Sequence, residues 1–395
     1  MSDKRTTTSL RGKVSIVGAF DTEVGVLPGR SPMQLAVEAA LGAIADAGLT
    51  KEDVDGLVTC GAMAEPMMYP AETMAEYLQI FPRYCMAVAA GGGTTFSAIY
   101  QAASLIEAGM ADIVVVAMAD SMKSGLTRDQ TLMVQASTGH PEFERPYGPT
   151  VPAYYALIAQ AHMAKYGTTP EQFAAIAVAC RARAHLNPAA QQRALISVED
   201  VMASRLVADP LRLLDCSLVS DGGSAIVMVS TERAKDMPHQ PVTILGAGEG
   251  HSHEHISHAR SLTTSAAREA GQRAYAMAGV GASQMDFAQL YDCFTPTVLI
   301  ELEDLGFCEK GEAGAFVDSG ALMPGGDIAV NTHGGLLSHC HPGNPGSMFA
   351  LTESVWQLRH DAGERQVDNA KLGLVHAQGG VMSSHTALIL GRETA

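Results

Sequence analysis

The most constraining feature of this chain is that its second half repeats the pattern of its first. The apolar run Lys13–Phe20 is matched by Pro241–Gly248, at an offset of about 230 residues. A strand, a glycine-rich turn and a helix are predicted over residues 84–108 and again over residues 327–360. The chain is therefore predicted to be an internal duplication of the α/β class, in which each half folds as a βαβαβ unit.

The division of the chain into parts follows from this repeat. We predict the first part of an N-terminal half over residues 1–119 and a C-terminal half over residues 232–395. Between them, residues 120–231 are an inserted region that returns to the N-terminal half. Apolar residues make up 47% of the chain and charged residues 17%, which favours a large buried core. Helices of the insertion are expected at residues 150–166, 170–184 and 198–205.

Charge and cysteine usage narrow the classes of partner and compartment. The net charge of −16 argues against direct nucleic-acid binding, because no basic run offers contacts to phosphates. Arg181, Arg183 and Arg193 are candidate anchors for a phosphorylated ligand, although solvated helix charges explain them equally well. No apolar run reaches the ~18 residues of a membrane span, and the N-terminus lacks the apolar core of a signal peptide. Seven scattered cysteines without a CxxC motif indicate a reducing, cytoplasmic location.

Chemically useful side chains gather in the loops that follow predicted strands. These loops are expected to converge, because the carboxyl ends of parallel strands meet at one edge of a sheet. The richest is Asn331–Pro342, where His333, His339 and His341 surround a paired glycine. His333 lies two residues after Asn331, so both side chains are predicted to point to one face. The other converging loops are residues 91–93, 291–295 and 376–380.

These motifs resemble those of the thiolase superfamily, and most closely its sterol-carrier-protein thiolase, or lipid-transfer, branch. The resemblance rests on the duplicated halves, the segment Asn331–Pro342, the segment Tyr291–Phe294 and the terminal pair Gly379–Gly380, and it covers nearly the whole chain. It implies a layered α/β/α/β/α core with an inserted helical loop domain. It also implies a coenzyme A thioester as substrate, with no tightly bound cofactor.

The resemblance assigns roles to particular residues. His341 matches the histidine that activates the nucleophile and helps form an oxyanion hole, although Cys340 replaces the preceding glycine. Cys293 matches a cysteine that moves the proton of the carbon nucleophile, with Tyr291 replacing a histidine. His376 falls where other thiolases place their second cysteine. His333 is a further catalytic candidate, and substrate contacts are expected from Gly92, Gly93, Tyr291, Asn331, Gly379 and Gly380.

The chain departs from the family at the nucleophile. Counting back from Gly109, the nucleophilic cysteine of thiolases falls on Gly92. Cys85 lies seven residues earlier, inside a predicted strand, and Thr94 and Thr95 are better explained as helix-start residues. Glycine cannot carry an acyl group between two half-reactions, so ordinary thiolysis conflicts with this sequence.

Carbon–carbon bond chemistry without a covalent acyl-cysteine remains compatible with these residues. The expected reaction makes or breaks a carbon–carbon bond of an acyl-CoA thioester, for example by retro-aldol cleavage of a β-hydroxyacyl-CoA, since Cys293 and His341 can stabilise an enolate. Lipid-transfer-type members that lack the cysteine work with a small OB-fold partner, often carrying a zinc ribbon. A homodimer through residues 84–90 is also implied. The alternatives are a true thiolase or acyltransferase that acts on a bulky 3-oxoacyl-CoA and uses an unexpected cysteine such as Cys85, and a non-catalytic acyl-CoA-binding scaffold subunit.

A second histidine cluster has the composition of a metal site. Residues 251–258 contain four histidines, and alternation along an extended loop would place three imidazoles on one side. A histidine-rich loop at the mouth of the site explains the same pattern. No metal ion is predicted to bind.

Overall fold

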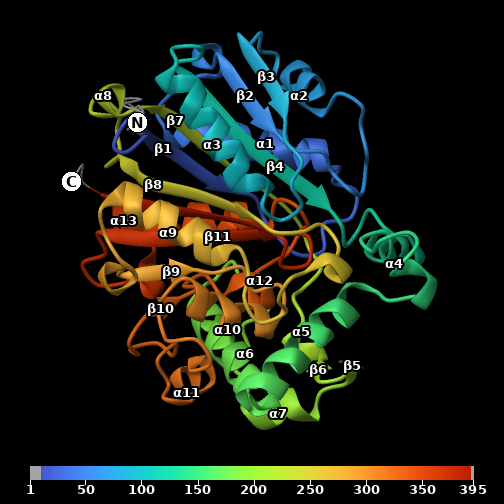
Figure 1. The fold of residues 1–395 in the computed structure, drawn as a ribbon. Coiled ribbons are helices and arrows are strands. Elements are labelled where there is room, and N and C mark those ends of the chain that lie inside the picture. The colour runs from blue at the N-terminus through green and yellow to red at the C-terminus, as the bar shows by residue number, and fades with distance from the viewer. Residues whose placement is uncertain (1–9, 393–395) are drawn as a thin grey trace, which may run out of the picture.

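A ten-stranded sheet organises the protein in the computed structural model, which describes residues 10–392. Its order is β10-β9-β11-β12-β8-β1-β7-β4-β2-β3 (Figure 1). The strands of the N-terminal half are β1 (Val14–Asp21), β2 (Gly56–Thr59), β3 (Tyr84–Ala87), β4 (Ile113–Ser121) and β7 (Asp221–Ser230). Those of the C-terminal half are β8 (Val242–His251), β9 (Phe287–Gln289), β10 (Ala329–Val330), β11 (Leu372–Gly379) and β12 (Ser384–Gly391).

The duplication is visible in the order of the strands. Reading outwards from the middle, β1-β7-β4-β2-β3 in one half corresponds to β8-β12-β11-β9-β10 in the other. The halves meet where β1 pairs antiparallel with β8, with Ser15 opposite Thr243 and Ile16 opposite Val242. In both halves the last two strands of the order pair in parallel. The predicted pair of related α/β halves is confirmed.

Helices form the remaining layers. On the outside, α1 (Pro32–Asp46) packs on β1, β4 and β7, and α9 (Ala267–Ala278) packs on β8 and β12. Between the halves lie α3 (Thr94–Glu107), which contacts β4 and β12, and α13 (Gly346–Arg359), which contacts β1 and β11. Nearly every residue of α13 is buried, as expected of a helix covered by sheet on two sides. The layered α/β/α/β/α core is confirmed.

The insertion supplies helices and then a strand. Its helices are α4 (Arg128–Ala136), α5 (Val151–Tyr166), α6 (Pro170–His185) and α7 (Val198–Ala203), followed by the short hairpin β5 (Leu206–Ala208) and β6 (Leu211–Arg212). The three helices predicted in the insertion are confirmed, and α6 packs against α10, α11 and α12 of the C-terminal half (Figure 1). The chain then returns through β7, which fills the sheet between β1 and β4.

The shorter helices complete the chain. They are α2 (Pro70–Leu78), α8 (Thr231–Ala234), α10 (Thr295–Asp304), α11 (Ala313–Asp318) and α12 (Gly335–Ser338). None of the helices within residues 10–392 has both the length and the apolar character to cross a membrane.

The predicted strand at residues 327–331 is shorter than expected. Only Ala329 and Val330 pair in the sheet, because Asn331 has a left-handed backbone with φ of 49°. The Asn331 N–H donates to the Ala288 carbonyl, and its side-chain oxygen accepts from the Leu290 N–H. Asn331 therefore ends the strand and ties it to β9, which fixes the start of the histidine-rich loop.

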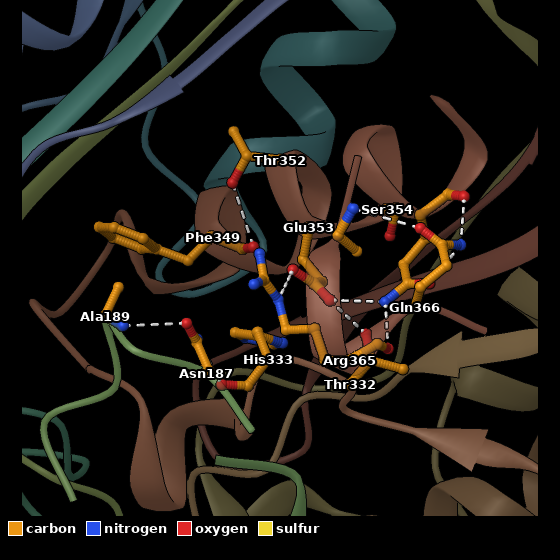
Figure 2. Close-up of polar contacts among 12 residues, drawn as sticks. Asn187, Ala189, Thr332, His333, Phe349, Thr352, Glu353, Ser354, Arg365 and Gln366 are labelled. Carbon is orange, nitrogen blue, oxygen red and sulfur yellow. Dashed lines mark hydrogen bonds and ion pairs between the residues drawn. The ribbon is translucent and has the colours of Figure 1, made fainter. Parts of the chain in front are cut away.

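A buried ion pair anchors α13 next to that loop. Glu353 is fully buried, and its carboxylate accepts from Arg365 Nε at 2.8 Å and from Thr332 Oγ1 at 2.7 Å (Figure 2). Because a buried carboxylate without its cation is costly, Arg365→Met should lower the free energy of unfolding by about 3–5 kcal/mol in chemical denaturation. The double variant Glu353→Gln/Arg365→Met should recover part of this loss. An Arg365→Met variant as stable as the wild type would contradict this role.

Candidate active site

A pocket of about 280 Å³ opens where the loops of both halves meet the insertion. The N-terminal half contributes Gly92, from the turn that precedes α3. The C-terminal half contributes its strand-end loops, and the insertion contributes residues of α4, α5 and the segment before β7. Its polar lining residues include Tyr155, Ser217, Tyr291, Cys293, His341 and Gln378.

Three side chains form a hydrogen-bonded row along one wall. The hydroxyl of Tyr291 lies 3.3 Å from Nε2 of His341, and Nδ1 of His341 lies 2.9 Å from Oγ of Ser217. Burial lowers the pKa of His341 to about 4, so the imidazole is neutral at pH 7. With its proton on Nδ1 directed to Ser217, the ring presents Nε2 as an acceptor for Tyr291. The row can therefore pass a proton from the tyrosine oxygen to the histidine.

The Tyr291 hydroxyl occupies the space that a side chain at position 92 would need. A Cβ atom built on Gly92 would lie 2.3 Å from the Tyr291 hydroxyl oxygen and 2.2 Å from the carbonyl oxygen of Gln378. Both separations are far inside van der Waals contact. A cysteine at this position is therefore incompatible with the observed place of Tyr291.

The thiol of Cys293 lies on a second polar wall. Gln378 Nε2 approaches its Sγ at 3.3 Å and also donates to the Tyr155 hydroxyl. That hydroxyl donates to the carbonyl of Gly380, and the Tyr155 ring stacks on Phe294 at 4.3 Å between centroids. Burial raises the pKa of the Cys293 thiol well above its ordinary value, so the group is a protonated thiol at neutral pH.

Comparison with known proteins agrees with this architecture. Residues 14–232 match the family model of the thiolase N-terminal domain, and residues 248–392 match the thiolase C-terminal domain-like model. The chain belongs to the thiolase superfamily. It is 39% identical to a steroid side-chain-cleaving aldolase from Thermomonospora curvata, over 97% of this chain and 99% of that protein.

Two further relatives of this thiolase-superfamily chain carry names of different reactions. An acetyl-CoA acetyltransferase from Methanothermobacter thermautotrophicus is 35% identical, over 96% of this chain and 99% of that protein. The solved structure of the Ltp2-ChsH2(DUF35) aldolase superposes with a TM-score of 0.85 at 36% identity, over 97% of this chain and 98% of that chain. Since both aldolases and acyltransferases occur among the relatives, the residues of the pocket decide between them.

The thiolase fold brings only part of the predicted site together. Gly92, Tyr291, Cys293, His341 and Gly380 line the pocket. The structure places Gly93, Asn331, His333, His376 and Gly379 outside its lining. These five residues belong to the same loops as the pocket residues. Their side chains point into the core, or, for the glycines, their backbone packs against a neighbouring segment.

His333 lies in the buried layer around α13. Its carbonyl accepts from Asn187 Nδ2 at 2.9 Å (Figure 2). Its ring meets that of His339 edge to face, with 5.3 Å between the centroids. Burial and the neighbouring His339 hold the pKa of His333 well below its ordinary value. The side chains of Asn331 and His333 therefore do not meet at the pocket as predicted, because the left-handed residue Asn331 breaks the alternation of an extended strand.

The paired glycines allow close approach of two backbone segments. A Cβ atom on Gly379 would lie 2.1 Å from the Ala90 carbonyl oxygen. This contact joins the end of β11 to the turn that presents Gly92, and only glycine fits there. Gly379 therefore helps to position the turn that carries Gly92, although it does not line the pocket itself.

Cys85 lies apart from the pocket. It belongs to β3, and its side chain packs with the cluster between the sheet and the outer helices α1 and α2. Burial raises the pKa of its thiol to about 11. Neither its position nor its ionisation matches a thiolase nucleophile.

The other candidates from the sequence have structural partners. Arg181 and Arg183 are buried in α6, where they donate to Ser338 Oγ and to the Met323 carbonyl. Both side chains are therefore buried in the protein and not exposed to bind the phosphates of a ligand. The rings of His255 and His258 face His140 at 4.9 and 6.2 Å, so the histidine-rich loop forms an aromatic cluster with the insertion.

Sequence reasoning missed Ser217, Tyr155 and Gln378. Ser217 and Tyr155 come from the insertion, whose place over the pocket depends on tertiary packing. Gln378 stands in the loop that the sequence singled out, and its side chain shares the sheet face of His376. The alternation of side chains along the predicted strand could therefore have placed Gln378 on the same face as His376.

Proposed function

We propose that this protein cleaves a carbon–carbon bond of a β-hydroxyacyl-CoA by a retro-aldol reaction, without a covalent acyl-cysteine. The position of the Tyr291 hydroxyl carries this proposal. It fills the space of a side chain at Gly92 and is hydrogen-bonded to His341. The family's nucleophile is thus replaced by an acid–base group at the same place.

The row Tyr291–His341–Ser217 removes the proton of the substrate's β-hydroxyl. Burial raises the pKa of Tyr291 well above its ordinary value, so a free tyrosinate is inaccessible at neutral pH. A relay avoids this intermediate: as the tyrosine oxygen accepts the substrate proton, its own proton passes to His341 Nε2. The imidazolium that results, held by Ser217, provides positive charge within the pocket while the enolate forms.

Cys293 completes the reaction. Electrons of the broken bond pass from the α-carbon into the thioester carbonyl as an enolate, while the β-carbon leaves as a ketone or aldehyde. The protonated Cys293 thiol gives its proton to the α-carbon, and the proton held by the relay returns to the thiol through solvent. The products are a carbonyl compound and a shortened acyl-CoA, and no free coenzyme A is consumed.

The pocket favours a bulky apolar acyl group. Met63, Met122, Val134, Val151 and Phe294 contribute apolar side chains to its lining. A steroid-like ring system attached at the β-carbon agrees with these walls and with the name of the aldolase from Thermomonospora curvata. We therefore include such substrates first among those to be tested.

Partners and location complete the proposal. A small OB-fold subunit is expected to bind this chain, as the Ltp2-ChsH2(DUF35) aldolase contains a partner of its own. A homodimer is expected through β3, which ends the sheet beside the exposed Phe81, Tyr77 and Met86. All seven cysteines are free thiols, which supports a cytoplasmic location.

The pH dependence of kcat/KM tests the relay. The acceptor is neutral His341, and burial lowers its pKa to about 4. Activity should therefore persist from pH 7 to about 5 and fall about tenfold per unit only below about pH 4. The free energy of unfolding should fall as pH drops from about 6.5 towards 4, because unfolding restores the ordinary pKa of this histidine and so binds a proton. An acid limb of kcat/KM near pH 6.5 would contradict neutral, buried His341 as the acceptor.

Product analysis tests the reaction class. The chain, alone and with its co-purifying small subunit, is incubated with β-hydroxyacyl-CoA and β-ketoacyl-CoA panels, with and without free coenzyme A. Cleavage of β-hydroxyacyl-CoA that ignores free coenzyme A is the expected result. Cleavage of β-ketoacyl-CoA that requires free coenzyme A would instead support an acyltransferase, as in the relative from Methanothermobacter thermautotrophicus. Tight binding without turnover of either panel would support the scaffold alternative.

A further inference from the structure

Behind the pocket wall, three buried side chains converge on one point. They are Glu301 of α10, His376 of β11 and His385 of β12, and one ligand atom of each lies within 4.8 Å of the others. His376 Nε2 is 3.0 Å from His385 Nδ1, and His376 Nδ1 is 3.4 Å from Glu301 Oε2. The two imidazoles are stacked, with 5.2 Å between their centroids.

Isolation from water makes this cluster unusual. Glu301 and His385 have no exposed surface and His376 is 1% exposed. The contact between Glu301 and Nδ1 of His376, at 3.4 Å, is not a well-aligned hydrogen bond, so neither carboxylate oxygen has a hydrogen-bonded side-chain partner among the described residues. A buried carboxyl group paired this weakly is costly, because it loses its hydration and gains little in return. The reaction proposed above uses none of these three side chains.

We propose that Glu301, His376 and His385 bind a divalent transition-metal ion, of which Zn²⁺ fits best. Imidazole nitrogens and carboxylate oxygens are among the ligands that zinc binds in proteins. One ligand atom from each residue lies within 4.8 Å of the others, compared with about 3.3 Å between ligand atoms bonded at about 2.0–2.2 Å to a tetrahedral ion, so an ion would draw the three side chains together. A bound dication would also neutralise Glu301 and give a partner to the carboxylate oxygens.

The position of the cluster indicates what such an ion would do. It would join α10 to β11 and β12, two strands that already pair antiparallel in the sheet at this point. Cys293 lies just before α10, and Gln378 lies two residues beyond His376 on the same face of β11. The ion would thus hold the wall that positions Cys293, outside the pocket itself, as a structural metal. This site stands independently of the proposed reaction.

Metal analysis of the intact protein tests this site. Protein expressed in zinc-supplemented medium should contain about one zinc ion per chain by inductively coupled plasma mass spectrometry. Glu301→Gln, which preserves shape, should reduce this content to below about 0.2 per chain, because it removes a charged ligand. The control His258→Ala, which removes an exposed imidazole of the histidine-rich loop, should leave the content unchanged. Protein stripped with a chelator should regain its Tm when Zn²⁺ is added.

Two outcomes would overturn the site. One is protein with less than about 0.2 equivalents of any transition metal, whose Tm does not respond to Zn²⁺ or Co²⁺. The other is zinc content that survives in Glu301→Gln but disappears in His258→Ala, which would place the ion in the surface loop. If Glu301→Gln fails to fold, the zinc content and the Tm of the wild-type protein decide the question.

Discussion

Tyr291→Phe is expected to lower kcat/KM for carbon–carbon cleavage by about 10²–10⁴-fold, the usual contribution of a positioned acid–base group. The substitution keeps the ring and its edge-to-face contact with His341, so the pocket retains its shape. It removes the oxygen that accepts the substrate proton and donates to His341 Nε2 at 3.3 Å. Substrate binding should change much less than turnover. Steady-state kinetics with a cleavable β-hydroxyacyl-CoA measure both.

Tyr275→Phe is the matched control. Tyr275 is a partly buried tyrosine, and its hydroxyl donates to the Leu305 carbonyl at 3.1 Å, away from the pocket. Its removal should cost about 1 kcal/mol of stability and leave kcat/KM within about twofold of the wild type. Equal losses of activity in both variants would show that Tyr291 acts through folding. Full activity of Tyr291→Phe would remove it from the reaction.

Gly92→Ala is expected to reduce kcat/KM by at least about 10²-fold. The new Cβ atom would meet the Tyr291 hydroxyl at 2.3 Å and the Gln378 carbonyl oxygen at 2.2 Å. Relief of these contacts requires shifts of about 1 Å, and a displacement of this size in a catalytic group costs about 10²-fold. The hydrogen bond between Tyr291 and His341 should be lost at the same time. Kinetics and a crystal structure of the variant measure the two effects.

Gly93→Ala provides the comparison within the same turn. The nearest atom to its new Cβ would be the Ala90 carbonyl oxygen at 3.3 Å, a contact that a small adjustment relieves. We therefore expect near wild-type kinetics. If Gly92→Ala and Gly93→Ala behaved alike, general disturbance of the turn would explain the loss, and the claim that Tyr291 replaces a side chain at position 92 would be contradicted.

Much of the fold was predictable because the two halves share local sequence patterns that predict strands, turns and helices. Apolar strands, glycine stops and a Ser31 cap identified the outer elements, and Ser31 does form a capping box with Gln34. The strand β7 was the main omission. Its sequence, Asp221–Ser230, has two glycines directly after Asp221 and lies in the inserted region, where helices were predicted. Its identity as a strand depends on pairing with β1 and β4.

The sequence allowed us to predict which loops form the site, but not which of their side chains line the pocket. Cys293 and His341, which the resemblance singles out, stand in loops after strands and both line the pocket, while their catalytic roles stay predictions. Strand alternation could not place His333 or His376 relative to the pocket, because one follows a left-handed residue and the other, although on the same face of β11 as Gln378, lies two residues earlier on the strand, beside Glu301. The conflict between Tyr291 and a side chain at Gly92 joins residues about 200 positions apart, so only the folded chain reveals it.

Intact-protein mass spectrometry during turnover tests the central claim most directly. The protein is mixed with excess β-hydroxyacyl-CoA in the absence of free coenzyme A, quenched in acid and weighed, while the same samples are analysed for products. The account predicts that carbonyl product and shortened acyl-CoA accumulate over many turnovers while the protein mass stays unchanged. An acyl adduct that forms and decays at the rate of turnover, on Cys85 or any other cysteine, would contradict cleavage without a covalent intermediate.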